Sequence, residues 1–319
     1  MPRRFFRLFL ALLIPLALVA TGCGNDDAGT TAQVSEPTTT EAPATAESAP
    51  TPTPTPTPTQ APIQRPQRIV SLSPTATEIL FAIGAGEQVI AVDEYSYFPP
   101  AAPVTDLSGW DPNVEAVLAY EPDLVVISND ANDLVASMEA VGVAVLINPA
   151  PADFEGGYEA VADMGMTVGR IDEAAELIAR LRTEITSALS SAPVVPVRVY
   201  HELGESLHSA SSATFIGAVY EAMGTTNIAD LADNSGSGYP QLTEEYIVEA
   251  DPELIVITDQ VNYTAEDVAA RPGWGEIAAV RNGNIVTVNA DIASRWGPRL
   301  PQFINAVADA LQTVAVPVS

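Results

Sequence analysis

Apolar and polar positions follow two patterns along residues 68–147, one of strand length and one with a helical period. Short apolar runs rich in β-branched residues occur at 69–73, 89–92, 124–128 and 143–147. Apolar residues recur every three or four positions at 74–83, after residue 112 and at 134–141. The short runs are typical of buried strands, and the wider spacing predicts amphipathic helices. This alternation predicts a parallel sheet covered by helices.

A second series of the same kind begins after residue 196. Its strand-like runs are 197–201, 254–258 and 285–289. Its helical segments are 215–223, a stretch from Glu244, a stretch after Thr264 and a C-terminal stretch through Phe303 and Leu311. Between the two series, residues 171–190 form the longest uninterrupted helical pattern. We therefore expect two α/β halves joined by one long helix.

The same short sequence motif occurs in both halves. Glu115 is followed after six residues by Pro122 and Asp-Leu-Val-Val-Ile-Ser, and Glu245 is followed after six residues by Pro252 and Glu-Leu-Ile-Val-Ile-Thr. Each copy is typical of a helix that ends at a proline and is followed by a buried strand. The repetition predicts two similarly built lobes, and two lobes offer a cleft.

Local signals mark where several helices begin and end. Ser73 and Asp111 each precede a proline, which is favoured at the first helical position, so both are predicted N-caps. Thr75 and Glu78 have the spacing of a capping box. Gly84 follows a helical pattern and is typical of a C-terminal cap rather than a nucleotide site.

The N-terminus has the features of an export signal. Arginines precede an apolar run from Leu8 to Ala20, which is too short to span roughly 30 Å of hydrocarbon. The small residues before Cys23 resemble the lipobox of bacterial lipoproteins, so we predict that Cys23 becomes the lipidated first residue. An ordinary secretory signal with an incidental cysteine is the alternative.

A spacer is predicted between this signal and the folded part. Residues 24–65 are rich in Thr, Pro, Ala and Glu, and such a chain favours extended polyproline II at roughly 3.1 Å per residue. The predicted division of the chain is a signal peptide (1–22), a lipidated cysteine with a disordered spacer (23–65), an N-terminal lobe (66–168), a connecting helix (169–192) and a C-terminal lobe (193–319).

The composition restricts the partners. The chain has 41 acidic residues against 13 basic ones and a formal charge of −28. Such a surface repels nucleic acid and anionic headgroups, so the lipid is the only expected membrane contact. The single cysteine excludes an internal disulfide and a cysteine-based metal site. With only His201 and His208, a bare zinc or manganese site is not expected.

Catalysis is not expected. Carboxylate pairs can hydrolyse glycosides, but Glu121, Asp123, Asp251 and Glu253 flank the two repeated prolines and are typical of solvated helix ends and strand entries. The sequence has no Gly-x-Ser-x-Gly elbow, phosphate-binding glycine loop or Cys/His pair.

Five motifs in this order resemble those of the substrate-binding lipoproteins of bacterial ABC importers for cobalamin, ferric siderophores and haem. They are Arg68–Glu78, Asp106–Trp110, the paired Glu-to-Pro blocks, Arg271–Glu276 and Trp296–Leu300. The resemblance spans about residues 66–315. It implies two Rossmann-like α/β lobes joined by one rigid helix, with the ligand between them and chemically unchanged. It also implies a monomer without a cofactor, anchored by lipid to the outer face of the cytoplasmic membrane.

The resemblance implies roles for single residues. Glu115 and Glu245 match the positions that dock onto the two permease subunits, which work with an ATPase. A carboxylate in a first helical turn also suits the helix dipole without any partner. The implied ligand contacts are Tyr95, Trp110, Tyr239, Asp291 and Arg295, and flat aromatic walls suit a large rigid chelate.

Charge separates the candidate ligands. A ferric tris-catecholate carries several negative charges and would need a cluster of cations, yet few arginines can reach the cleft. Arg295 and Arg299 could serve one carboxylate or phosphate. We therefore favour cobalamin or a ferric hydroxamate siderophore. The alternatives are a haem-binding member, with His208 as an axial ligand, and a sensor or adhesin that reuses the fold.

Overall fold

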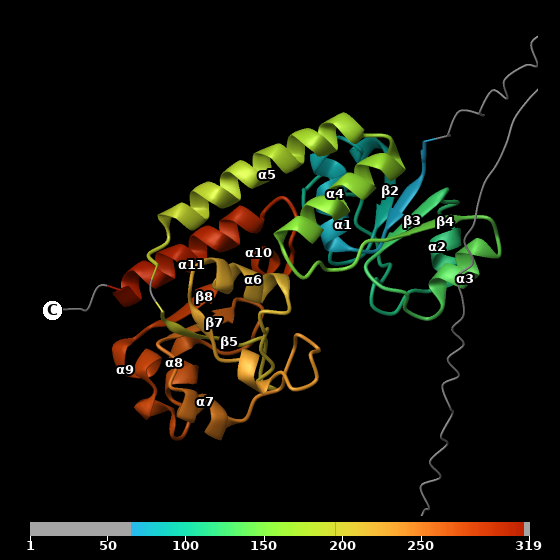
Figure 1. Cartoon of the computed structure of the whole chain (residues 1–319). Coiled ribbons are helices and arrows are strands. Elements are labelled where there is room, and N and C mark those ends of the chain that lie inside the picture. Colours follow the sequence, from blue (N-terminus) through green and yellow to red (C-terminus); the bar gives the residue numbers. More distant parts are fainter. Residues whose placement is uncertain (1–64, 195, 316–319) are drawn as a thin grey trace, which may run out of the picture. The chain divides into compact units, whose positions relative to one another are not determined.

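The computed structural model describes residues 65–194 and 196–315 (Figure 1). The predicted signal peptide, Cys23 and nearly all of the predicted spacer lie outside these residues. Among the described helices, none combines the length and the apolar character that a membrane span requires.

The first half is built on a parallel sheet of four strands in the order β2-β1-β3-β4. The strands are β1 (Ile69–Ser71), β2 (Val89–Val92), β3 (Leu124–Ile127) and β4 (Ala144–Ile147). The helices are α1 (Pro74–Ala82), α2 (Val114–Leu118), α3 (Leu134–Glu139) and α4 (Phe154–Val168). Every residue of β1 and β3 is buried, which explains their continuous apolar runs.

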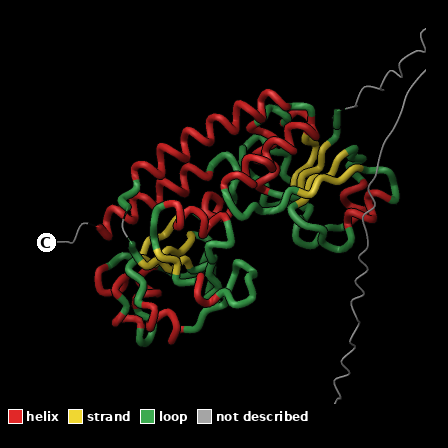
Figure 2. Tube along the Cα trace, viewed as in Figure 1, coloured by secondary structure: helices red, strands yellow, loops and turns green. Residues whose placement is uncertain are grey.

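The second half repeats this topology. Its strands are β5 (Arg198–His201), β6 (Thr226–Asn227), β7 (Leu254–Thr258) and β8 (Ile285–Val288), in the order β6-β5-β7-β8. Its helices are α6 (Phe215–Ala222), α7 (Glu244–Ala250), α8 (Ala265–Ala269), α9 (Ala278–Asn282), α10 (Ala290–Ser294) and α11 (Leu300–Ala315). Figure 2 shows the two sheets as separate groups of strands. Both sheets have the same strand order, so the prediction of two similarly built lobes is confirmed.

One long helix, α5 (Ile171–Ser191), connects the two halves. It packs against α4 of the first half and against α11 of the second half (Figure 1). Its buried face consists of Ala174, Leu177, Leu181, Ile185 and Ala188, at the helical spacing that the sequence predicts. These residues belong to one apolar cluster that includes core residues of both sheets. The predicted fold class, two α/β lobes joined by one long helix, is confirmed.

The helix caps follow the prediction only in part. Ser73 caps α1, where its side chain accepts a hydrogen bond from the backbone N–H of Ala76 at 3.3 Å. The predicted cap at Asp111 is wrong, because Asn113 caps α2 and accepts from the backbone N–H of Ala116. The predicted capping box at Glu78 is also wrong, because the Glu78 carboxylate contacts two distant arginines.

An arginine fastens the end of the repeated helix in each lobe. The Arg68 Nε donates to the carbonyl of Glu121 at 2.7 Å, and the Arg198 Nε donates to the carbonyl of Asp251 at 2.8 Å. Glu121 and Asp251 precede the repeated prolines and have φ angles of 50° and 46°, respectively. Because residues before proline disfavour the right-handed helical region, neither helix continues to its proline, and the carbonyls just after α2 and α7 are free to accept from the arginine.

The acidic residues after the repeated prolines also have structural partners. Asp123 accepts the backbone N–H of Arg68 at 2.9 Å, and Glu253 accepts the backbone N–H of Arg198 at 3.0 Å. The sequence indicated solvated carboxylates here. In the structure Asp123 is exposed and Glu253 is partly exposed, and each one also binds the start of the first strand of its lobe.

His201 has a structural position in the core of the second lobe. Its ring is buried against Tyr220 and Phe303, and its Nδ1 lies 2.7 Å from the Tyr220 hydroxyl. Burial lowers the pKa of His201 to about 4. The imidazole is therefore neutral at physiological pH.

We predict that His201→Gln makes the free energy of unfolding less sensitive to acid. In the unfolded chain histidine has a pKa of about 6.5. Below that pH protonation favours unfolding, and roughly 3 kcal/mol is lost by pH 4. Glutamine can still bond Tyr220 but does not titrate. Urea unfolding between pH 7.5 and 4 should show the wild-type stability falling relative to the variant. A constant difference across this range would contradict the prediction.

Candidate functional site

A cleft of about 630 Å³ lies between the two lobes. Its N-terminal wall comes from the segments that follow β1, β2, β3 and β4, together with the loop 108–110. Its C-terminal wall comes from Gln260, which follows β7, and from residues 291–296, which follow β8. In open parallel sheets, ligands bind beyond the carboxyl ends of the strands. The position of this cleft therefore follows from the topology of both sheets.

Most of the predicted ligand residues line this cleft. Tyr95, Trp110, Asp291 and Arg295 do so, although they come from both lobes. Trp110 is 88% exposed, which leaves its ring available to a ligand. Tyr239 is exposed but does not belong to the lining of this cleft. The structure thus assembles the predicted set with one exception.

Other lining residues are aromatic or neutral and polar, and the sequence did not indicate them as ligand contacts. The aromatic ones are Tyr97 and Trp296, and the polar ones are Ser73, Thr75, Ser108, Ser128, Asn129, Asn148, Gln260 and Ser294. Many lie just after a strand, which is the signal that could have found them. Gly109 lets the Trp110 loop approach the sheet, because a Cβ there would lie 2.1 Å from the carbonyl oxygen of Leu72.

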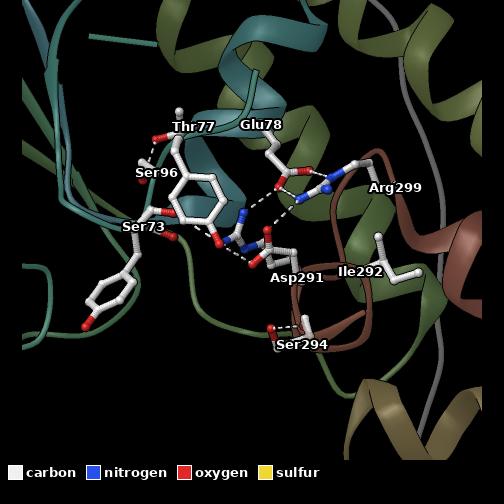
Figure 3. Close-up of polar contacts among 12 residues, drawn as sticks. Ser73, Thr77, Glu78, Ser96, Asp291, Ile292, Ser294 and Arg299 are labelled. Atoms are coloured by element: carbon white, nitrogen blue, oxygen red, sulfur yellow. Dashed lines mark hydrogen bonds and ion pairs between the residues drawn. The ribbon is translucent and has the colours of Figure 1, made fainter. Parts of the chain in front are cut away.

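A buried ionic network crosses between the lobes beside the cleft (Figure 3). Glu78, on α1 of the first lobe, has a side chain that is only 1% exposed. Its carboxylate accepts from Arg295 Nη1 at 2.9 Å, from Arg299 Nε at 2.9 Å and from Arg299 Nη2 at 2.6 Å. Both arginines belong to the second lobe. Charge-assisted bonds of this kind are stronger than neutral ones.

The same network reaches the cleft wall through Arg295. Its Nη2 lies 2.8 Å from Asp291 Oδ1 and donates to the carbonyl of Tyr95 at 3.1 Å. The Tyr97 hydroxyl donates to Asp291 Oδ1 at 2.9 Å. Arg295 therefore positions three groups of the wall: a carboxylate of its own lobe and two tyrosines of the other.

These contacts leave little of Arg295 and Arg299 exposed to a ligand. From the sequence, Arg295 and Arg299 could serve an acidic group of the ligand. In the structure the side chains of Arg295 and Arg299 are only 8% and 14% exposed, and both guanidinium groups bind protein carboxylates.

Asp93, another lining residue, is buried, and burial raises the pKa of its carboxyl group.

The two repeated glutamates occupy equivalent places on the surface. Glu115 lies in the first turn of α2 and Glu245 in the first turn of α7, and both are exposed. Their helices begin at the capping residues Asn113 and Thr243. Within the described ranges, no hydrogen bond or ion pair joins either glutamate carboxylate to another residue. Both side chains are accessible to a partner.

The other candidate groups lie outside the cleft lining. His208 bonds the Ser206 hydroxyl at 2.9 Å. Arg271 forms a bidentate pair with the buried carboxylate of Glu202, at 2.6 and 2.7 Å, and lies over the Trp274 ring. The Arg-Pro-Gly-Trp segment thus braces the second lobe. The described part of the chain contains no cluster of three or more His, Cys, Asp or Glu side chains suited to a metal ion.

Two α/β lobes, each built on a parallel sheet, with a cleft between them define a two-lobed binding protein. The chain belongs to the periplasmic binding protein family, whose model matches residues 69–292. The proteins of this family bind their ligands for transport rather than react with them, which agrees with the prediction that the chain is not an enzyme. The family also places the protein outside the cytoplasm.

Individual relatives cover most of the chain. It is 33% identical over 264 residues to a cobalamin-binding protein of Halobacterium salinarum, covering 79% of this chain and 71% of the relative. It is 27% identical over 313 residues to YvrC, an ABC transporter substrate-binding lipoprotein of Bacillus subtilis, covering 94% and 95% of the two chains. The fold is similar to that of the haem-binding protein RhuT of Roseiflexus sp. RS-1, with a TM-score of 0.70, 24% identity, and coverage of 78% and 99%.

Proposed function

We propose that this chain is the substrate-binding lipoprotein of an ABC importer and that it captures a corrinoid of the cobalamin type. The observation that carries the proposal is the lining of the cleft, which combines aromatic faces with neutral amides and hydroxyls. A corrinoid has a large apolar ring system and a periphery rich in amides. Aromatic walls suit the ring, and side-chain amides and hydroxyls can pair with the periphery.

The charges of the cleft support the same choice. Arg295 is the one basic residue in the lining, and Glu78 and Asp291 already bind its guanidinium group. A ferric tris-catecholate would bring several negative charges without a cation to receive them. A ferric hydroxamate is weakly charged and is the second candidate among the chelates. The name of the Halobacterium relative adds support for cobalamin.

The haem alternative has less support in the site. In that alternative His208 is an axial ligand of the haem iron, but His208 lies outside the cleft lining and bonds Ser206. The sensor or adhesin alternative does not require the matched pair of exposed carboxylates on α2 and α7. We therefore place corrinoid transport before both alternatives.

The first prediction of this proposal concerns the ligand. Purified, lipid-free protein should bind cyanocobalamin in a calorimetric or fluorescence titration. Trp110→Ala should weaken that binding at least about tenfold, because an aromatic anchor at a binding surface commonly carries that much energy. Leu231→Ala is the matched control, because Leu231 is 86% exposed but does not line the cleft.

Parallel titrations with haem and a ferric hydroxamate decide between the ligand classes. Tight binding of haem alone would show that the protein is the haem-binding alternative. Absence of binding to all three probes would refute the proposed metal-chelate function.

We further propose that Glu115 and Glu245 dock onto arginine-containing pockets of the two permease subunits. Each carboxylate is exposed, lies in the first turn of an equivalent helix and has no partner among the described residues. Glu–Arg pairs across such an interface orient the docked protein and contribute to its affinity.

Glu115→Ala combined with Glu245→Ala should abolish most ligand uptake in cells that depend on this protein. Ligand affinity of the purified variant should be unchanged, because neither residue lines the cleft. The matched control is Glu139→Ala with Glu184→Ala, which removes the same charge from exposed positions of α3 and α5. Equal loss of uptake in the control, or loss of ligand affinity in the test variant, would contradict the docking role.

We also propose that Cys23 carries the lipid and is the membrane anchor of the mature protein. Its sequence context supports this, although it lies outside the described residues. Cys23→Ala should move the protein from the membrane fraction to the soluble extracytoplasmic fraction. Retention of the variant in the membrane fraction would argue against a lipid anchor at this position.

A further inference from the structure

Glu78 lies behind the wall of the cleft, where it binds two arginines of the second lobe. Its carboxylate is not part of the cleft lining, and its side chain is 1% exposed. It nevertheless binds Arg295, the one basic residue in that lining, and Arg299, whose guanidinium lies over the Phe98 ring. Two positive charges of the second lobe are thus held by one buried negative charge of the first.

The negative charge of Asp291 completes the balance. Asp291 Oδ1 lies 2.8 Å from Arg295 Nη2, and Asp291 Oδ2 lies 3.8 Å from Arg299 Nη2. The network therefore contains two carboxylates and two guanidinium groups. The lining adds only acidic groups to this balanced set, namely Asp93 and Glu94. The cleft as a whole presents no net positive charge to a ligand.

A different arrangement of the same residues would give a different binding site. If Glu78 were uncharged, Asp291 alone would face two guanidinium groups, and Arg295 already lies at the cleft wall. An arginine with a free edge binds carboxylates and other planar anions in a bidentate manner. The charge of Glu78 is thus what separates the present cleft from an anion-binding one.

We propose that Glu78 is a specificity-determining residue that reserves the cleft for electroneutral chelates. It does so by neutralising Arg295 and Arg299 across the lobe boundary, so that an anionic chelate finds no free cation. This inference rests on the proposed function, since it concerns the ligand class of the same cleft. A merely structural Glu78 would join the lobes without affecting the choice of ligand.

The test compares one neutral and one anionic probe on Glu78→Gln. The glutamine keeps the size of the side chain and one acceptor but removes its charge. We expect affinity for ferric enterobactin, an anionic tris-catecholate, to rise about tenfold or more, as a gained charge-assisted contact would give. Affinity for cyanocobalamin should fall or stay the same, so the ratio of the two dissociation constants changes in favour of the anion.

Glu202→Gln is the matched control. Glu202 is also a buried carboxylate in a bidentate arginine pair, but neither it nor Arg271 lines the cleft. Both variants lose one buried charge, so thermal unfolding should report a comparable loss of stability. Only Glu78→Gln should change the ratio of the two affinities.

Each outcome bears on the inference. An unchanged ratio in Glu78→Gln, or the same change in Glu202→Gln, would overturn it. If Glu78→Gln does not fold, Asp291→Asn removes the other negative charge of the network and must shift the ratio in the same direction. Failure of the wild type to bind cyanocobalamin would refute the proposed corrinoid ligand. The affinity of Glu78→Gln for ferric enterobactin, compared with that of the wild type, would still decide the role of Glu78.

Discussion

The contact between Glu78 and the pair Arg295 and Arg299 joins the two lobes at the wall of the cleft. Removing one partner of a buried ion pair leaves an uncompensated charge and costs roughly 3–5 kcal/mol. The network is therefore favourable only when both lobes are in place. The apolar face of α5 constrains the lobes at a second place, because it shares one core with both sheets. Two such constraints favour a cleft of fixed dimensions over a wide hinge.

The internal repeat explains how two distant sequence segments acquire the same geometry. In each lobe an arginine at the start of the first strand binds a carbonyl of the segment that follows the repeated helix, and the acidic residue after proline binds that arginine's backbone N–H. Arginine near a helix C-terminus is favourable because it complements the negative end of the helix dipole. The clamp fixes α2 and α7 in equivalent positions, and with them Glu115 and Glu245 at their first turns.

Local patterns predicted much of the fold but little of the site. The strands β1, β3 and β7 were predictable from their continuous apolar runs, and the helix α5 from the helical period of its apolar residues. The two-residue strand β6 and the short helices α9 and α10 are too brief for such a signal. Glu78 illustrates the limit for the site: its spacing to Thr75 predicted a local capping box, while its actual partners lie more than two hundred residues away.

The arginines of the chain connect its overall charge to the choice of ligand. With a formal charge of −28, the protein repels anionic chelates before they reach the cleft, and only a cluster of free cations could offset this field. The described arginines do not form such a cluster. Arg182 binds Glu155, Arg198 binds Asp251, Arg271 binds Glu202, and Arg295 and Arg299 bind Glu78. Because protein carboxylates hold these cations in both lobes, the long-range field and the short-range contacts of the cleft agree with the proposed class of uncharged ligand.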